Sequence, residues 1–307
     1  MKPSHAAIAN VRMGITMDLN NKNCLICESS EIDERLQKLR DSNSISVLSC
    51  RSCGHSFLNS FGHISDAYFE RGQFLLNKDY IDGVEDRRRH YEYENQNRFE
   101  RICPLIINKN VLDFGCGIGS LMEKIKPLAK TVEGVDPTDP FREHVQAQGH
   151  ACHAVIDDAI GPYDFISAFH VLEHIPDPIA VLRDLSGKLS PNGLLYVEVP
   201  NVNDALVILY DIEAYHRFNF FKDHLHYFSR HSLGLAIAKA GLKAAGISGH
   251  NRFGLANHMY WLRHGKPGGH LEWSFLETPS LAREYARALA AMDISDSLVA
   301  QIRLMGK

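Results

Sequence analysis

The sequence lacks long apolar runs and an excess of basic residues. None of its 307 residues belongs to a stretch approaching the roughly 18 to 20 apolar residues that cross a bilayer. The segment Met1 to Asn20 also lacks the apolar core of a secretory signal. With 33 Lys and Arg against 37 Asp and Glu, the net charge is -4, and no general basic field is available for a nucleic-acid backbone. We therefore expect a cytoplasmic protein that does not act at a membrane. Nucleic acid is disfavoured as its substrate.

Cysteine is present in a pattern that predicts a metal site. Cys24 and Cys27 form one Cys-x-x-Cys pair, and Cys50 and Cys53 form a second after a 22-residue spacer. Two such pairs supply four thiolates to one tetrahedral ion, and Gly54 relieves the turn after the last of them. We interpret them as a structural zinc site whose metal stabilises a segment too small to bury much core. A redox pair and unliganded buried thiols are the alternatives.

From Asn110 onward, short apolar strands alternate with helical segments, a pattern typical of a parallel sheet built from βαβ units. A helix is expected to begin at Asp177 and Pro178, which supply a cap and a first helical residue. Other helices are expected at 85–106, 232–240 and in the tail 277–305, and strands at 111–114, 131–135, 163–168, 194–199, 242–247 and 257–262. These segments predict a mostly parallel seven-stranded sheet flanked by helices.

The first of these strands ends at Asp113 and runs into a glycine-rich loop formed by Gly115, Cys116, Gly117 and Gly119. Glycine has no Cβ, so the backbone of a strand-to-helix turn can approach a ligand closely. Dinucleotide sites use a similar turn against a pyrophosphate, and the loop alone does not distinguish the ligands. Cys116 is expected to face the ligand without reacting.

Two carboxylates narrow the choice of ligand. Asp113 precedes the loop, where a carboxylate repels a pyrophosphate but attracts the ammonium or sulfonium group of S-adenosylmethionine. Asp136 ends the next strand, is followed by Pro137, and is suited to accept hydrogen bonds from two vicinal ribose hydroxyls. The pair favours an adenosyl ligand without a pyrophosphate.

From about Asn110 to Leu262 the chain resembles the class I, Rossmann-like, S-adenosylmethionine-dependent methyltransferases. The resemblance rests on four segments, which are Leu112 to Gly119, Gly134 to Pro137, Phe169 to Ile175 and Leu189 to Leu195. It implies cofactor contacts at Asp113, Gly115, Cys116, Gly117, Gly119, Asp136, Pro137, Asp157, Phe169 and His170. Asp157 is the adenine contact in this assignment, with Ile156 and Asp158 as alternatives.

The patterns along the sequence divide the chain into four expected parts. They are a zinc-ribbon-like module with an N-terminal arm at 1–60, a helical connector or lid at 61–107, the methyltransferase domain at 108–265 and a helical tail at 266–307. A four-cysteine module joined to this domain is similar to zinc-containing methyltransferases of sugars and secondary metabolites, and also to some that act on ribosomal RNA. The order of the parts along the chain therefore does not identify the methyl acceptor.

Two histidine clusters are candidates for chemistry. Methyl transfer to a hydroxyl or a carbon acid requires removal of a proton, a task suited to histidine. His170 and His174 bracket Glu173 after the fourth strand, and His224 and His226 share a face if their segment is extended. We predict that the base is among His224, His226 and His170, with hydrogen-bonded structural roles as the alternative. A catalytic metal is not favoured, since no third ligand is recognisably spaced with the histidine pair.

The expected function is methyl transfer to an oxygen or carbon of a small molecule or carbohydrate, such as a nucleotide-linked sugar or glycan precursor. The segment after the fourth strand lacks the Asn/Asp-Pro-Pro-aromatic sequence typical of enzymes that methylate exocyclic amines. Two alternatives stay open. The first is methylation of ribosomal or transfer RNA held by the zinc module, and the second is a non-catalytic zinc-bearing scaffold. The sequence gives no indication of the oligomeric state.

Overall fold

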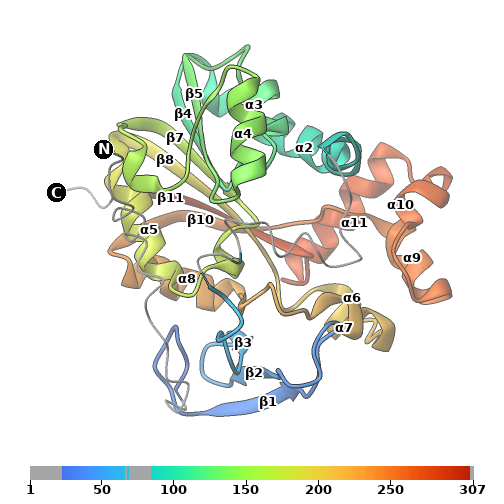
Figure 1. Ribbon diagram of the computed structural model, residues 1–307. Helices are drawn as coiled ribbons and strands as arrows, with labels where there is room; N and C mark the ends of the chain where they lie inside the picture. The colour runs from blue at the N-terminus through green and yellow to red at the C-terminus, as the bar shows by residue number, and fades with distance from the viewer. Residues whose placement is uncertain (1–22, 66–67, 69–83, 305–307) are drawn as a thin grey trace.

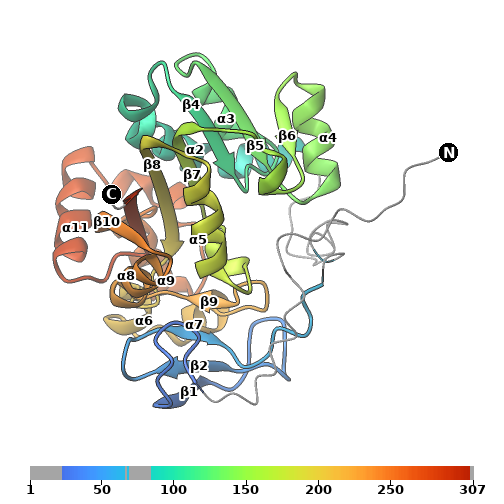
Figure 2. The same ribbon diagram turned by 90° about the vertical axis from the view of Figure 1, so that its left-hand side faces the viewer.

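The computed structural model of the chain describes residues 23–65, 68 and 84–304, so the expected N-terminal arm and residues 66–67 and 69–83 of the expected lid lie outside the described residues. The described chain forms a seven-stranded and a four-stranded sheet. In both views the four-stranded sheet lies at one end of the molecule, below the larger one (Figure 1, Figure 2). No helix within these ranges is long and apolar enough to cross a membrane.

The seven-stranded sheet is mostly parallel and has the strand order β10-β11-β8-β7-β4-β5-β6. Only β11 is antiparallel to its neighbours, β8 and β10. The predicted Rossmann-like α/β fold is confirmed. The strands are β4 (Asn110–Phe114), β5 (Thr131–Val135), β6 (Ala151–His153), β7 (Tyr163–Phe169), β8 (Leu189–Pro200), β10 (Leu242–His250) and β11 (Ser297–Leu304).

Helices cover both faces of this sheet. On one face, α5 (Pro178–Gly187) and α8 (Arg230–Lys239) bury apolar side chains against alternate residues of β4, β7, β8 and β11. On the other face, α2 (Val84–Ile106) and α3 (Ser120–Ile125) do the same. Because successive side chains of a strand point to opposite faces, the apolar side chains of each central strand pack against the helices on both faces of the sheet.

Local sequence signals explain where the main helices begin. At α5, Oδ1 of Asp177 accepts a hydrogen bond from the N–H of Ala180 at 2.9 Å, and Pro178 occupies the first turn, as predicted. At α8, Ser229 and Ser232 form a reciprocal capping box. These caps fix the N-terminal ends of α5 and α8.

The remaining helical elements lie mainly beyond β8 in the chain. They are α4 (Asp139–Ala147), η2 (Ile156–Asp158), η3 (Leu172–His174), α6 (Ala205–Ile208), α7 (Glu213–Asn219), α9 (Leu255–His264), α10 (Gly269–Glu272), η4 (Ser274–Leu276) and α11 (Pro279–Ala291).

The four-stranded sheet joins the cysteine-bearing segment to a distant part of the chain. Its order is β1-β2-β3-β9, with β1 (Ile32–Leu36), β2 (Val47–Cys50), β3 (Ser56–Leu58) and β9 (His226–Tyr227). The β3 strand pairs with β9, so Phe57 faces His226 in the register. The expected boundaries at 60, 107 and 265 remain predictions, and strands of the expected zinc module and of the expected methyltransferase domain form one sheet.

Three expectations about secondary structure are corrected. Residues 257–262 belong to α9 and form no strand, because Ala256 and Tyr260 are buried one helical turn apart and Gly265 ends the helix at φ 61°. The tail is helical only as far as α11, and its last eight described residues form β11 in the sheet. The strand expected at 194–199 begins earlier, because β8 extends from Leu189 through an irregularity where its partners in β7 shift between Leu189 and Leu194.

Candidate functional site

The glycine loop connects β4 to α3 in a conformation that favours glycine. Gly115, Gly117 and Gly119 have φ values of 76°, 55° and 75°. A Cβ on Gly115 would overlap the side chain of Val171, whereas a Cβ on Gly117 would meet no atom within 4 Å. Gly117 therefore borders open space, as a loop that receives a ligand against its backbone must.

Asp113 and Asp136 lie on either side of this loop because β4 and β5 are neighbouring parallel strands, with Asp113 beside Gly134 in the register. Oδ1 of Asp113 accepts a hydrogen bond from Oγ of Ser167 at 2.8 Å. Oδ2 of Asp136 accepts one from the N–H of Gly117 at 2.8 Å, and its Oδ1 accepts one from the N–H of Thr138 at 2.9 Å. Both carboxylates are buried, and Asp136 ties the second strand directly to the loop.

Burial dominates the electrostatics of this pair. Loss of hydration raises the pKa of Asp113 to about 6, although the Ser167 hydrogen bond and the charge of Arg98 oppose the shift. Burial also raises the pKa of Asp136, against hydrogen bonds from Thr138 and Gly117. A nearby positive group stabilises the ionised form of a buried carboxylate. This is the property expected of a residue that contacts an ammonium or sulfonium group.

The other expected cofactor contacts differ in how close they lie to the glycine loop and in how exposed they are. Cys116 lies inside the loop, with Sγ 3.6 Å from Sγ of Cys152, and Pro137 follows Asp136. Phe169 ends β7 beneath the guanidinium of Arg98, which lies 5.1 Å from its ring centroid. Asp157 is exposed in η2, where its carbonyl accepts a hydrogen bond from Lys188 at 3.2 Å. Its assignment to adenine remains a prediction.

His170 follows β7 and lies between two carboxylates. Its Nε2 is 3.1 Å from Oε1 of Glu198, and its Nδ1 is 3.1 Å from Oε1 of Glu173. The residue has a φ of 55°, an uncommon value for histidine that places strain at this point of the chain. Burial and Arg252 oppose a positive charge, but the two carboxylates outweigh them and raise the pKa of His170.

Glu198 anchors a buried charge network under this histidine. It is fully buried on β8 and contacts Arg98 and Arg101 of α2 as well as His170. Burial disfavours its ionised form, yet His170 and the two guanidinium groups hold the pKa of Glu198 well below its usual range. This network was not among the features predicted from the sequence. A signal was present, because Glu198 is the single charge in the apolar strand 194–199 and therefore needs a partner.

His224 lies with Glu173 and His174, although it follows them by a long stretch of chain. One potential ligand atom from each of the three lies within 4.8 Å of the others. The rings of His174 and His224 meet edge to face at 4.8 Å, and the N–H of Leu225 donates a hydrogen bond to the carbonyl of Glu173 at 2.7 Å. Of the two expected histidine clusters, one member of each is thus brought together.

His226 lies apart from this group, in β9, facing the cysteine-bearing sheet. It is fully buried, with Nδ1 3.1 Å from Nε2 of His55 and Nε2 3.3 Å from the carbonyl oxygen of Pro176. Burial lowers the pKa of His226 to about 4. The structure therefore separates the two histidines in position, since His226 belongs to the four-stranded sheet and His224 lies beside Glu173 and His174.

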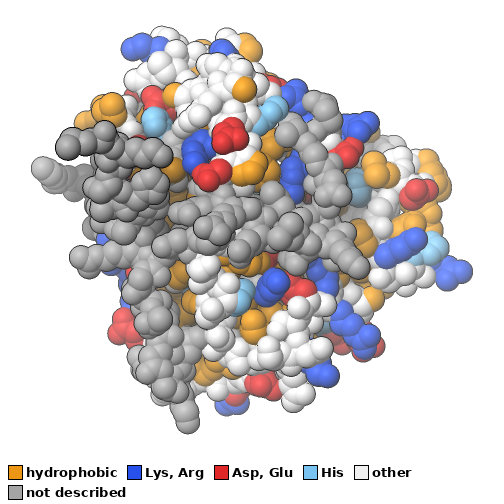
Figure 3. Space-filling model, in the orientation of Figure 1, with side chains coloured by type: hydrophobic (Ala, Val, Ile, Leu, Met, Phe, Trp, Pro, Cys, Tyr) orange, Lys and Arg blue, Asp and Glu red, His pale blue; other side chains and the backbone are white. Residues whose placement is uncertain are grey.

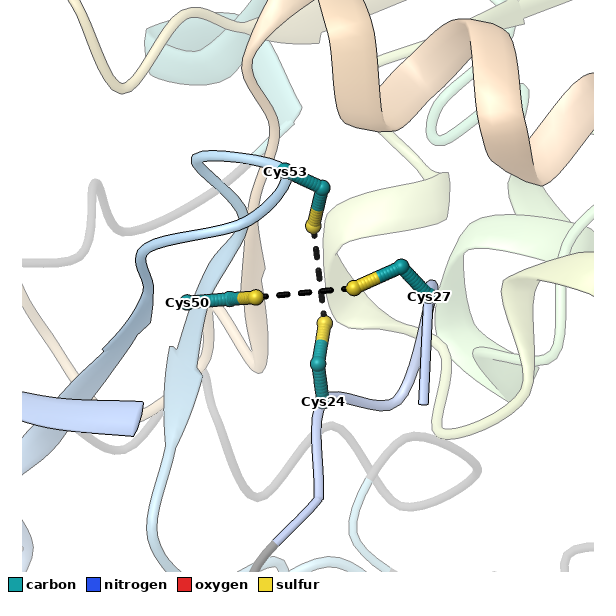
Figure 4. Close-up of side chains that lie close together, drawn as sticks. All are labelled: Cys24, Cys27, Cys50 and Cys53. Carbon is teal, nitrogen blue, oxygen red and sulfur yellow. Dashed lines mark hydrogen bonds between the residues drawn. The ribbon is translucent and has the colours of Figure 1, made fainter. Parts of the chain in front are cut away.

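The four predicted metal ligands converge on one point, as Figure 4 shows. Sγ of Cys24 lies 3.6 Å from Sγ of Cys53, and Sγ of Cys27 lies 3.5 Å from Sγ of Cys50. A tetrahedral zinc with Zn–S bonds of about 2.3 Å places its sulfur atoms about 3.8 Å apart, so the thiols fit such an ion with small adjustments. None of the four forms a disulfide.

The comparison with known protein families agrees with this geometry. Residues 87–245, more than half of the chain, match the family described as "Methyltransferase domain". Two similar proteins are named "Ubiquinone biosynthesis O-methyltransferase". The one from Actinobacillus pleuropneumoniae serotype 5b (strain L20) is 30% identical over 117 residues, covering 31% of this chain and 47% of the relative. The one from Chromobacterium violaceum is 30% identical over 159 residues, covering 47% and 68%. The chain spans about half the length of the first of these curated relatives.

Solved structures with a similar fold include a chain of the complex between the Haloferax volcanii Trm112 methyltransferase activator and a putative methyltransferase. It is 17% identical with a TM-score of 0.48, and the match covers 78% of this chain and 97% of that chain. Magnesium protoporphyrin IX methyltransferase from Synechocystis PCC 6803 is 17% identical with a TM-score of 0.46, covering 61% and 92%. Because the family match spans more than half of the sequence, this chain belongs to the methyltransferase domain family, within the class I S-adenosylmethionine-dependent methyltransferases.

Proposed function

We propose that the protein transfers a methyl group from S-adenosylmethionine to an oxygen atom, or to an acidic carbon, of a small-molecule or carbohydrate acceptor. The observation that carries this proposal is the convergence of the glycine loop, Asp113 and Asp136 with the histidine-bearing segment after β7, where Val171 packs on Gly115. Open α/β sheets bind their ligands at this carboxyl edge. The names of the O-methyltransferase relatives support oxygen over carbon.

The chain's own residues account for binding of the donor. Asp136 is placed to accept hydrogen bonds from ribose hydroxyls, and the open backbone at Gly117 admits the ligand. Asp113 supplies negative charge for the cationic end. S-adenosylmethionine supplies an electrophilic methyl group on a sulfonium, so the protein mainly has to align the two reactants and exclude water.

We assign removal of the acceptor's proton to the group around His224. As the acceptor oxygen bonds to the methyl carbon, the carbon–sulfur bond breaks with its electron pair on sulfur, and the hydroxyl proton passes to the imidazole. His224 is partly exposed beside His174, whereas His226 is enclosed and hydrogen-bonded on both ring nitrogens. His226 then acts as a positioning residue, and His170 helps to shape the site.

We also propose that the four thiols hold a structural zinc ion. Ser229 Oγ donates a hydrogen bond to the carbonyl of Cys53 at 2.9 Å, and the N–H of Leu58 donates one to the carbonyl of Leu225 at 3.0 Å. The cysteine-bearing segment therefore holds the chain on both sides of His226. Its role in this proposal is to build the wall of the acceptor site.

RNA methylation is the second candidate, and the charge distribution disfavours it. On the face shown in Figure 3, the described Lys and Arg side chains are interspersed with Asp and Glu, without a continuous basic stripe. A nucleic-acid site would need basic residues clustered along the path of the backbone. The net charge of -4 points the same way.

Calorimetric titration of the purified full chain with S-adenosylmethionine tests the proposal. We expect binding by the wild type and a loss of at least about tenfold in affinity for Asp136→Asn, which removes a charged acceptor at the ribose. Asp139→Asn is the matched control, because Asp139 is exposed at the start of α4 and pairs with Arg142. Absence of binding by the wild type would refute the proposal.

The acceptor is identified by transfer of a labelled methyl group to catechols, nucleotide-linked sugars and RNA in parallel. Product analysis then shows whether oxygen or carbon carries the label. We expect label in a small-molecule pool and none in RNA. Label in RNA alone would replace the proposed acceptor class with the second candidate.

A further inference from the structure

We propose that Glu173, His174 and His224 form a binding site for a divalent transition-metal cation that holds the acceptor through two neighbouring oxygen atoms. The inference rests on the proposed function for the identity of the acceptor, but not for the site itself. The site is separate from the four cysteines and uses nitrogen and oxygen ligands.

The three side chains are brought together by elements that the backbone holds in register. Glu173 and His174 belong to η3, directly after the sheet, and His224 precedes β9. The N–H of Leu225 donates a hydrogen bond to the carbonyl of Glu173 at 2.7 Å, which links the two segments. Candidate ligand atoms within 4.8 Å of one another need only small rotations to reach a shared ion at about 2.0–2.2 Å.

Glu173 is an unsatisfied buried carboxylate. It is 0% exposed, and within the described residues neither of its oxygens has a hydrogen-bond partner. Nδ1 of His170 lies 3.1 Å from Oε1 and pairs with it when the imidazole is protonated, whereas Oε2 has no ion pair within the described residues. Burying such a group costs free energy unless a partner compensates it, and a bound cation is a partner that fits.

Both histidines have a nitrogen available for coordination. Nδ1 of His174 lies 2.7 Å from the carbonyl oxygen of Asp223, which can only accept, so Nδ1 carries the proton and Nε2 keeps its lone pair. A histidine oriented in this way by a backbone carbonyl is the usual arrangement around a metal ion. Nδ1 of His224 is buried and has no partner among the described residues.

The ligand set indicates the class of cation. Two imidazoles and one carboxylate favour Mn²⁺, Fe²⁺, Co²⁺ or Zn²⁺ over Mg²⁺ and Ca²⁺, which prefer oxygen ligands throughout. Three protein ligands leave coordination positions open. Glu173 lies inside while His174 and His224 are partly exposed, so an acceptor would reach those positions from the side of the two histidines.

The acceptor class follows from this geometry. Two adjacent oxygens, as in a vicinal diol or a catechol, occupy neighbouring open positions of one ion, and coordination makes a hydroxyl more acidic. With the cation bound, His224 serves as its ligand and the hydroxyl proton leaves to solvent. Without a cation, His224 takes that proton itself, as in the proposed function.

Binding of Mn²⁺ to the full chain, with the cysteine site filled by zinc, tests this inference. Electron paramagnetic resonance of the free Mn²⁺ gives the bound fraction directly, and Mn²⁺ competes poorly for thiolates. We expect about one bound Mn²⁺ per chain, and at least about tenfold weaker binding for Glu173→Gln and His224→Asn. His216→Asn is the matched control, since His216 lies in α7 and pairs with Asp211 at the surface.

Titration of each variant with S-adenosylmethionine separates the two proposals. A wild type that binds S-adenosylmethionine but no Mn²⁺ overturns the metal site and leaves the proposed function standing. Equal Mn²⁺ binding by wild type and His224→Asn also overturns it. Binding of Mn²⁺ without S-adenosylmethionine would instead contradict the proposed function alone.

Discussion

Val171 packs so closely on Gly115 that a side chain at position 115 would overlap it. Val171 follows His170 and immediately precedes η3, the element that carries Glu173 and His174. The loop assigned to the donor and the segment assigned to the acceptor thus share a direct contact. A change on one side of it is expected to reach the other.

We predict that Gly115→Ala and Gly117→Ala weaken donor binding for different reasons. Both positions have a positive φ, which costs alanine about 1–2 kcal/mol. At Gly115 the new methyl also displaces Val171, so we expect a further loss of stability, whereas at Gly117 it enters open space. Thermal unfolding should show the larger decrease for Gly115→Ala, and calorimetry should show weaker binding for both. Equal stability of the two variants would contradict the role of Val171.

Donor affinity is expected to fall as the pH falls through about 6. Burial raises the pKa of Asp113 to about 6 in the free protein, so the residue becomes protonated and neutral below that pH. A cationic ligand group favours the ionised form, and each pH unit below the pKa of the free protein therefore costs up to about tenfold in affinity. Calorimetry from pH 5 to pH 7 measures the effect. The variant Asp113→Asn should bind the donor weakly, with an affinity that does not change between pH 5 and pH 7. The same pH dependence in that variant as in the wild type would show that another group titrates.

Loss of one cysteine ligand should disturb more than the metal. We expect Cys50→Ser to remove bound zinc and to destabilise the protein by about 3 kcal/mol or more, since metal binding contributes directly to folding. Turnover should fall as well, because β3 holds β9 close to His224. Metal analysis and thermal unfolding are the measurements. Cys103→Ser is the control, as Cys103 lies in α2 outside the cluster. Wild-type protein without zinc after gentle purification would refute the metal assignment.

The buried charge of Glu198 should be costly to remove. Glu198→Gln removes the buried counter-charge of Arg101 and leaves Arg98 paired with Glu94 alone, and breaking such a network costs about 3–5 kcal/mol. We expect a decrease of this size in the free energy of unfolding measured by urea denaturation. Glu133→Gln is the matched substitution on β5, where the partly exposed side chain contacts His153, and it should cost less than about 1 kcal/mol.

Much of the donor side could be predicted because its signals are local. A strand that ends in Asp113, three glycines at a turn and a second strand followed by Asp136 all lie within 25 residues of chain, on two strands that pair directly. The same holds for the cap at Asp177 and the two cysteine pairs.

The acceptor side could not be predicted in the same way, since it depends on contacts between distant segments. His224 and His226 share a face by sequence spacing, but β9 turns His226 toward His55 and leaves His224 beside His174. The strand that replaces the predicted one at 257–262 lies beyond α11, where a helical pattern concealed it. Pairing with β8 and β10, rather than local propensity, makes 297–304 a strand.

The position of β11 has a consequence for synthesis of the protein on the ribosome. The strand fills the space between β8 and β10, both of which precede it in the chain. Until residues 297–304 have emerged, β8 presents an unpaired apolar edge that invites association with other nascent chains. Closure of the sheet is therefore delayed until after most of the domain has been translated.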